Sequence, residues 1–313
     1  MLMFIVKRLL HAIPILLGVS VLVFGLVQLI PGNPLDLLIP PEAPPELRAQ
    51  MMAAYGFDRP LHVQYFNWLG RTLQGDLGRS VFTGAPVAGE LFSALGNTFL
   101  LAIPAALLGF ALGITLGTVA AFHQGTWIDK SLSALAITGV SLPHYWLAIV
   151  LVVIFSVTLN WLPAQGMGFQ GLPSSWGEAQ SLVLPVVTLS LIPMGVVARV
   201  VRATVLEVLN QEFVATLHAK GLIGREVLFH VLKNAAPAAL AVMGLQFGYL
   251  LGGSILVETV FNWPGSGNLL NLAVFRRDIP VMQATIVVLA FFFVLVNLLV
   301  DIAQAAIDPR IRR

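Results

Sequence analysis

Residues 212–235 read EFVATLHAKGLIGREVLFHVLKNA, a charged and amphipathic stretch that lies between two of the most apolar parts of the chain. Its first half has helical periodicity, with one side made of Phe213, Val214 and Leu217 and another made of Glu212, Thr216 and Lys220. Gly221 permits a tight or left-handed turn, so we expect two short helices that break at this residue. The residues leave open whether these helices rest on lipid headgroups or dock on a cytoplasmic protein.

The composition indicates a membrane protein. Of 313 residues, 58% are hydrophobic and only 10% are charged, and the mean hydropathy is +0.88. The net charge of +2 argues against a polybasic surface, so we predict no nucleic-acid partner. The absence of cysteine excludes disulfides, thiolate metal sites and cysteine nucleophiles.

Six apolar stretches are long enough to cross a bilayer, which requires about 20 helical residues. They are Leu9–Ile30, Asn97–Phe122, Ser131–Leu159, Leu182–Leu206, Ala235–Val257 and Val281–Ile307. Backbone amides in lipid must bond within their own segment, so we predict an all-α membrane protein with six transmembrane helices in one domain, residues 1–313. We expect the first stretch to be a retained anchor, because no small-residue cleavage site follows it.

Charge asymmetry predicts the orientation of these spans. With both termini in the cytoplasm, eleven of the seventeen Lys and Arg residues lie inside and six lie outside. Residues 207–234 then form a cytoplasmic loop, and residues 31–96 form an extracytoplasmic loop. Within the latter we expect short helices near Glu46–Tyr55 and Leu61–Leu73, followed by a turn at Gly75-Asp76-Leu77-Gly78.

Glycines recur every fourth residue in two of the spans, as Gly109, Gly113, Gly117 and as Gly244, Gly248, Gly252. This spacing places each trio along one helix face, where backbones can approach closely. The pattern is compatible with static packing and with a smooth surface along which helices slide.

Polar side chains inside the spans are few, namely Gln28, Asn97, His144, Gln246 and Asn297. Glu258 and Asp301 lie near span ends, where charge is tolerated. The absence of a mid-membrane carboxylate pair argues against a proton-driven carrier and against a channel with a charged filter. No metalloprotease, serine-hydrolase or phosphate-binding motif occurs, and the six histidines are dispersed. We therefore predict no catalytic, cofactor-binding or metal-binding residue in this chain.

The opening stretch also carries a family resemblance. Glu212-x-x-Ala215-x-x-x-Ala219-Lys220-Gly221, followed by Val231-x-Lys233-Asn234, resembles the EAA loop of ABC importer permeases. The closest likeness is to the dipeptide, oligopeptide and nickel permease family. An arginine that is usual in that family is replaced here by Ala215 or His218.

Further motifs extend the resemblance over nearly the whole chain. They are Asp58-x-Pro60-Leu61-x-x-Gln64-Tyr65, Gly75-Asp76-Leu77-Gly78-x-Ser80, Ser141-Leu142-Pro143-x-x-Trp146-Leu147, Glu258-x-x-Phe261-x-Trp263-Pro264-Gly265-x-Gly267, Asn297-Leu298-x-x-Asp301 and Asp308-Pro309-Arg310. Each motif alone is weak, whereas their common order and spacing are specific.

The resemblance implies a type I ABC importer permease fold in a bacterial inner membrane, and a role as half of a translocation pathway. It implies a second homologous permease, two cytoplasmic subunits that bind ATP and Mg²⁺, and an extracytoplasmic solute-binding protein, all assembled in membrane lipid. The residues that it assigns to ATPase coupling are Glu212, Phe213, Val214, Ala215, Leu217, Ala219, Lys220 and Gly221. Phe213, Val214 and Leu217 would face either the ATPase or the ends of the membrane helices.

The sequence leaves more than one cargo and more than one class of function open. Peptides are the most frequent cargo of the resembled family, while near relatives carry nickel or other metal chelates, opines or glutathione. Asn97, Gln246 and Tyr249 are candidate pathway residues, although packing within the bundle explains each of them equally. A stand-alone carrier or channel, and a structural subunit without a pathway, are the competing classes of function.

Overall fold

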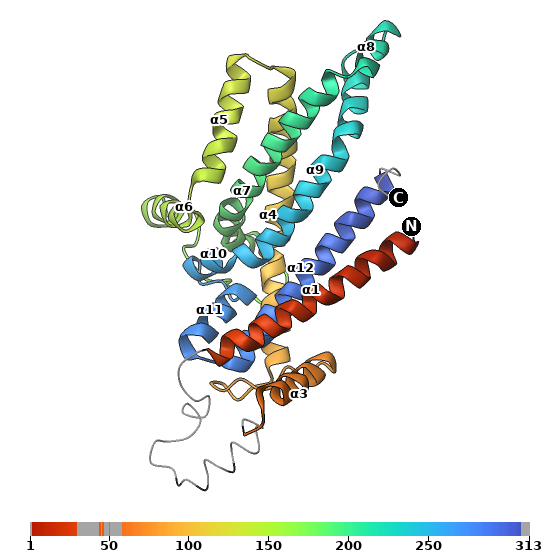
Figure 1. Ribbon diagram of the computed structural model, residues 1–313. Coiled ribbons are helices and arrows are strands. Elements are labelled where there is room, and N and C mark those ends of the chain that lie inside the picture. Colours follow the sequence, from red (N-terminus) through yellow and green to blue (C-terminus); the bar gives the residue numbers. More distant parts are fainter. Residues whose placement is uncertain (1, 30–43, 45, 47–49, 51–57, 308–313) are drawn as a thin grey trace.

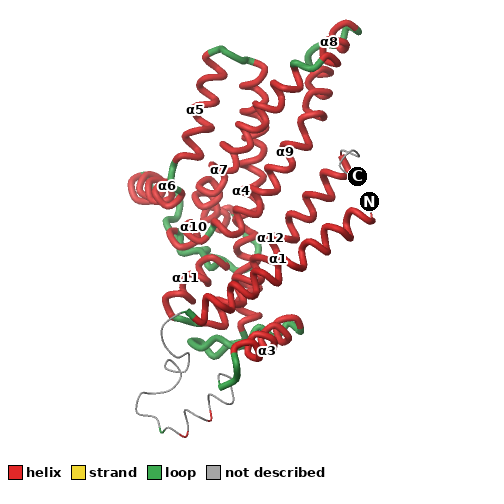
Figure 2. Tube along the Cα trace, viewed as in Figure 1, coloured by secondary structure: helices red, strands yellow, loops and turns green. Residues whose placement is uncertain are grey.

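The computed structural model describes residues 2–29, 44, 46, 50 and 58–307, and the regular secondary structure within these ranges consists of helices and one isolated bridge between Arg79 and Pro86. Figures 1 and 2 show long helices that run side by side with short helices at both ends. In chain order the elements are α1 (Leu2–Gln28), α3 (Leu61–Leu73), α4 (Val87–Phe122), α5 (Trp127–Ser141), α6 (His144–Leu151), the π-helix η2 (Val152–Thr158), α7 (Trp176–Leu209), α8 (Glu212–Ala219), α9 (Arg225–Gly253), α10 (Ile255–Val260), α11 (Ser266–Arg276) and α12 (Ile279–Ile307).

Five continuous helical segments within the described ranges have the length and hydropathy to cross a membrane. They are Ile5–Gln28, Val87–Phe122, Trp176–Leu209, Arg225–Val260 and Ile279–Ala306. A sixth span exists only if α5 and the α6–η2 segment are counted together. Five of the six apolar stretches in the sequence therefore form single spans, and the third does not.

The predicted span Ser131–Leu159 is wrong as one straight helix, because α5 and the α6–η2 segment meet at an angle of 101°. Leu142 and Pro143 adopt extended backbone angles, with ψ of 128° and 129°. Proline lacks an amide donor and disfavours helical geometry at the residue before it. Helix α6 consequently projects sideways from the bundle (Figure 1).

Helices α4 and α7 form the most extensive helix–helix contact in the bundle, and glycines allow their close approach. A Cβ atom added at Gly109, Gly113 or Gly117 would lie 2.6 Å, 2.8 Å or 2.5 Å from atoms of α7. Two of those atoms are backbone oxygens, which cannot move aside as a side chain can. This trio therefore serves static packing within the chain.

The second glycine trio divides between two environments. Gly244 and Gly248 lie against Val300 and Phe293 of α12, where an added Cβ would approach to 2.5 Å and 2.6 Å. Gly252 has no such neighbour among the described residues. Close packing therefore explains two of the three glycines on α9.

The two ends of the molecule carry different short elements. Helix α8 lies at one end, while α3 and the start of α4 lie at the other (Figure 1). Helix α1 begins and α12 ends toward the side of α8, and Arg8 and Asp301 form an ion pair of 3.0 Å between them. Helix α3 has the bounds predicted from the sequence, and Tyr65 and Trp68 pack against Phe24 of α1.

The remaining sequence predictions for residues 31–96 have mixed outcomes. Gly75 and Gly78 have positive φ, and the Asp76 carboxylate accepts a 3.0 Å hydrogen bond from the Gly78 amide, so the predicted turn is confirmed. The predicted helix near Glu46–Tyr55 falls largely outside the described residues.

Candidate coupling site and pathway residues

Helix α8 stands at the tip of the long hairpin formed by α7 and α9 (Figure 1). It begins after Gln211, whose backbone is extended. Glu212 places a carboxylate in the first turn, where the negative charge interacts favourably with the positive end of the helix dipole. The short helix extends only to Ala219, so its position depends on how it ends and on what its apolar side contacts.

The end of α8 is a Schellman cap. The Leu222 amide donates to the Leu217 carbonyl at 3.1 Å, and the Gly221 amide donates to the His218 carbonyl at 2.9 Å. Gly221 has φ of +81°, a conformation that residues with a Cβ rarely adopt. The turn predicted at Gly221 is thus a specific backbone device that fixes the exit direction of the chain.

The apolar side of α8 is used inside the molecule. Val214 is 3% exposed, and it belongs to a buried cluster with Val227 and Val231 of α9. Phe213 and Leu217 are partly buried and pack against the same cluster. Of the two placements that the sequence left open for these side chains, the structure has them on the ends of the membrane helices.

The second predicted short helix is wrong as a separate element. Residues from Arg225 onward belong to α9, which continues without a break to Gly253. The apolar periodicity of this segment is real, because Val227 and Val231 are buried. It reflects packing of an extended transmembrane helix, and the sequence pattern is the same in both arrangements.

The outward side of α8 is polar and small. The exposed predicted coupling residues are Glu212, Ala215, Ala219, Lys220 and Gly221. Two alanines at positions i and i+4 leave room for a partner to approach the helix backbone, and the flanking Glu212 and Lys220 supply opposite charges. The eight residues therefore divide into an inward set of three and an outward set of five.

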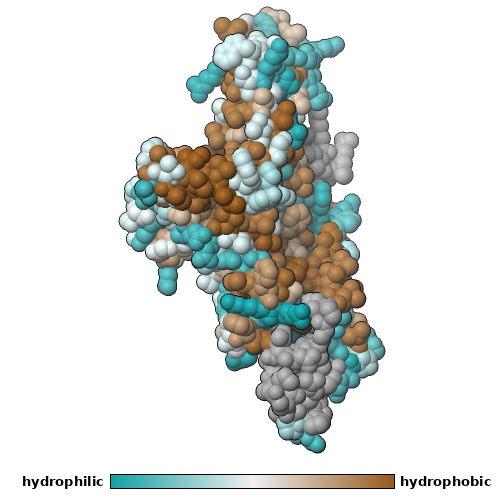
Figure 3. Space-filling model, turned by 90° about the vertical axis from the view of Figure 1, so that its left-hand side faces the viewer, coloured by the Kyte–Doolittle hydropathy of each residue, from teal (hydrophilic) through white to brown (hydrophobic). Residues whose placement is uncertain are grey.

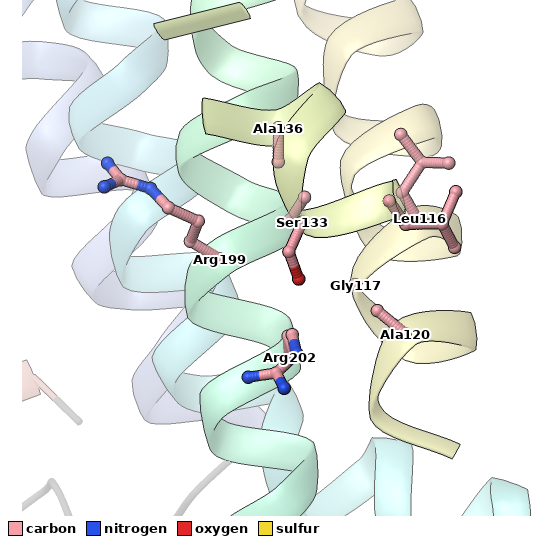
Figure 4. A pocket seen from close by; sticks show the side chains of 9 residues that line it. Leu116, Gly117, Ala120, Ser133, Ala136, Arg199 and Arg202 are labelled. Atoms are coloured by element: carbon pink, nitrogen blue, oxygen red, sulfur yellow. The ribbon is translucent and has the colours of Figure 1, made fainter. Parts of the chain in front are cut away.

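A partly buried ion pair joins α5 to α7, and it was not recognised in the sequence. Arg202 donates to both oxygens of Asp129, at 2.6 Å and 2.7 Å, and the Gly125 amide donates to the same carboxylate at 3.0 Å. Arg202 also borders a cavity between α4, α5 and α7 that is about large enough for one water molecule (Figure 4). The sequence feature that could have indicated this pair is Asp129, a lone carboxylate at the start of an apolar segment.

The three predicted pathway residues do not form one group. The Asn97 side chain donates to the Pro264 carbonyl at 2.9 Å, and its own carbonyl accepts from the Trp263 indole at 2.9 Å, so Asn97 holds the α10–α11 connection. Gln246 and Tyr249 lie one turn apart on α9, and the His144 ring contacts Tyr249 with ring centroids 6.4 Å apart. Only these last two candidates come together.

Two carboxylates near the α3 end are buried, which the sequence did not indicate. Glu258 is 0% exposed, although its position had suggested a solvated span end. Hydrogen bonds stabilise it there, because Thr98, Ser254 and the Asn268 amide donate at 2.8 Å, 2.9 Å and 3.0 Å. Asp278 is 3% exposed, and its carboxylate accepts a hydrogen bond from the Ser80 hydroxyl. It also accepts from the backbone amides of Val81 and Phe82, in the loop before α4, at 3.2 Å and 3.3 Å.

Apolar side chains cover the middle of the molecule, and hydrophilic residues gather toward its ends (Figure 3). The exposed apolar residues of the projecting α6–η2 segment include Tyr145, Trp146, Ile149, Val153, Ile154 and Val157. This distribution, together with a hydrophilic helical tip, defines a multi-pass membrane protein with a surface suited to a soluble partner.

Comparisons with known proteins identify the family. Residues 113–313 match the model of the binding-protein-dependent transport system inner membrane component, and residues 1–103 match the N-terminal model of the same kind of membrane component. The chain belongs to this family, which confirms the resemblance noted in the sequence. It is a multi-pass inner-membrane permease component of a binding-protein-dependent transport system.

Three relatives are similar over almost their full lengths. The glutathione transport system permease GsiC of Salmonella typhimurium is 42% identical over 100% of this chain and 99% of its own length. A putative peptide transport system permease of Brucella abortus is 40% identical over 98% of both chains. The dipeptide transport system permease DppB of Alkalihalophilus pseudofirmus is 38% identical over 100% of both.

One solved structure shares the fold. A chain of the MetNI methionine ABC transporter, in an inward-facing conformation, aligns with a TM-score of 0.57 and 17% identity, covering 71% of this chain and 98% of its own. At this identity the likeness establishes the fold alone, which is that of an ABC transporter permease.

Proposed function

We propose that this chain forms half of the translocation pathway of an ATP-driven importer of short peptides, and that α8 couples it to partner ATPase subunits. ATP and Mg²⁺ would be bound by two such subunits, with no cofactor in this chain. A second homologous permease would complete the pathway, and a solute-binding protein would deliver the cargo. The family membership and the geometry of α8 support this proposal.

The burial of the apolar side of α8 is the observation that carries the coupling role. A helix that rests on lipid headgroups needs a free apolar face to insert. Phe213, Val214 and Leu217 are instead packed inside the chain, and the outward face holds Glu212, Ala215 and Lys220. A hydrophilic face with small side chains suits contact with a soluble protein better than contact with lipid.

The length of the hairpin supports a position of this face beyond the hydrocarbon. The Arg225–Val260 segment has 36 residues, which corresponds to about 54 Å of helix against a hydrocarbon thickness of about 30 Å. Charged residues occur in and around α8, from Glu207 to Lys233, so part of the excess length lies at this end. The tip can therefore reach a partner in the aqueous phase.

We infer that α8 and both termini are cytoplasmic and that α3 lies outside, because this orientation places most Lys and Arg residues inside. The chain has no cysteine, so single cysteines can report sidedness without background. In intact spheroplasts that express this chain without ATPase subunits, an impermeant maleimide should label a Thr83→Cys variant and not an Ala215→Cys variant. Both variants should react after permeabilisation, and labelling of Ala215→Cys from outside would refute this orientation and the coupling role of α8.

The relatives favour short peptides as cargo. Two of the three are named for peptide or dipeptide transport, and one is named for glutathione transport. Glutathione is itself a tripeptide, so it is the second candidate. The nickel or metal-chelate and opine alternatives have no support among these three relatives.

Reconstitution tests the whole proposal. The chain, co-expressed with a second permease and two ATPase subunits, should purify as one complex and should take up labelled dipeptide into proteoliposomes only with ATP and the binding protein. Competition then distinguishes the cargo, because inhibition by excess glutathione and not by dipeptides would assign glutathione. ATP-independent uptake by the chain alone would instead identify a stand-alone carrier.

A further inference from the structure

His144 and Tyr249 meet where α6 begins after α5, and Gln246 lies about one turn from Tyr249 on α9. His144 is the first residue of α6, and its ring contacts the Tyr249 ring edge-on, with an angle of 70° between the planes. Gln246 precedes Tyr249 by three positions on α9, so both side chains lie on the same side of that helix. The 101° bend at Leu142–Pro143 places the start of α6 there.

Two polar atoms of this cluster, one on His144 and one on Gln246, have no hydrogen-bond partner in the described part of the chain. His144 is only 8% exposed, and its Nε2 atom is buried without a hydrogen bond, as is the Oε1 atom of Gln246. Thr138 and Asn297 each donate at 2.9 Å to a carbonyl of their own helix, whereas Thr118, Ser156 and Thr285 each have a buried hydroxyl oxygen without a partner in the described part of the chain. A buried polar group without a hydrogen bond is destabilising, so a partner from outside the chain would stabilise this cluster.

The chemistry of the cluster selects the kind of partner. Several charged groups in the spans are engaged elsewhere, in the Arg8–Asp301 and Arg202–Asp129 pairs and in the hydrogen bonds of Glu258. A neutral imidazole, a carboxamide and a phenol each offer both a donor and an acceptor. This set matches an amide group, which also has one donor and one acceptor, better than it matches a charged terminus.

We propose that His144, Gln246 and Tyr249 form a contact point for main-chain amide groups of the transported peptide, which rests on the function proposed above. Tyr249 is 50% exposed and is the accessible member of the three. The passing peptide displaces its ring and exchanges hydrogen bonds with His144 and Gln246. The site carries no charge, so it holds the peptide weakly and without regard to its side chains.

The test uses the complete transporter in proteoliposomes and measures the ratio of dipeptide taken up to ATP hydrolysed. His144→Phe and Gln246→Leu should each lower this ratio by about tenfold, the equivalent of one lost hydrogen bond of about 1.4 kcal/mol. His144→Gln keeps a donor and an acceptor and should restore most of it. Asn297→Leu removes a polar group that bonds only to its own helix and should leave the ratio unchanged.

A second measurement does not depend on the stability of the variants. A dipeptide that carries a photoreactive diazirine should, during ATP-driven turnover of the wild-type transporter, label residues 142–146 or 246–249. The inference is overturned by wild-type ratios in both His144→Phe and Gln246→Leu, by an equal loss in Asn297→Leu, or by labelling confined to other segments. A wild-type transporter that takes up no peptide would refute the proposed function, and this inference with it.

Discussion

Replacing Gly113 by leucine is expected to prevent the chain from folding into a stable bundle, so that almost no monodisperse protein is recovered in detergent. An added Cβ at Gly113 lies 2.8 Å from the Val197 Cβ and 2.9 Å from the Met194 carbonyl oxygen. The oxygen belongs to the backbone of α7, so the two helices must separate to admit any side chain. A leucine extends the clash further and removes contacts between α4 and α7, the most extensive helix–helix contact of the protein.

The smaller change Gly113→Ala gives a graded measurement of the same effect. Overpacking in a close-packed interior costs about 1–3 kcal/mol, which exceeds the gain of about 1 kcal/mol that alanine provides over glycine in a helix. The melting temperature in detergent should therefore fall. Gly96→Ala is the matched control, because Gly96 lies on the same helix with no atom within 4 Å of an added Cβ. A Gly113→Ala variant as stable as Gly96→Ala would show that the α4–α7 contact is not tight.

Replacing Gly221 by valine is expected to uncouple the assembled transporter, with binding-protein-stimulated ATP hydrolysis lowered by about tenfold. Gly221 has φ of +81°, and a β-branched residue there carries backbone strain of about 1–3 kcal/mol. Relief of that strain breaks the hydrogen bonds of Gly221 and Leu222 to α8. The short helix then loses its fixed position on Val227 and Val231, and movements of an ATPase no longer reach α7 and α9.

The control for this experiment keeps the backbone conformation. Asparagine tolerates the left-handed region, so Gly221→Asn should retain most of the stimulated ATP hydrolysis. Steric crowding does not limit substitution at Gly221, because an added Cβ would have no atom within 4 Å. Both variants should still purify with the partner subunits, since Glu212, Ala215 and Lys220 on the outward face of α8 are unchanged. Wild-type stimulation in an assembled Gly221→Val transporter would contradict the role assigned to the cap.

The sequence predicted well those features that depend on neighbouring residues. The bounds of α3 and the turn after it follow from local periodicity and glycine placement, and both are confirmed. The start of α8 at Glu212 and the cap at Gly221 were also accessible, because capping requires particular residues at adjacent positions. Long apolar runs identified five spans, since a bilayer demands length and hydropathy and little else.

The errors share one physical origin. Hydrophobic periodicity is the same in a straight and in a bent helix, so the runs on both sides of Pro143 read as a single span. It is also the same in a short docked helix and in the extension of a long one, so α9 read as two elements. In both places the path of the chain depends on backbone angles and packing, which the count of apolar residues does not contain.

The sequence by itself determined that this protein spans the inner membrane, that it belongs to the binding-protein-dependent permeases, and where α8 begins and ends. Only the tertiary structure decided which side of α8 is free, why Glu258 is stable without solvent, and how His144 meets Tyr249. Each of these depends on groups far apart in the chain, such as Thr98 and Glu258, which are 160 positions apart. Composition and local propensity act over a few residues, whereas burial and hydrogen bonding depend on which distant segments fold together.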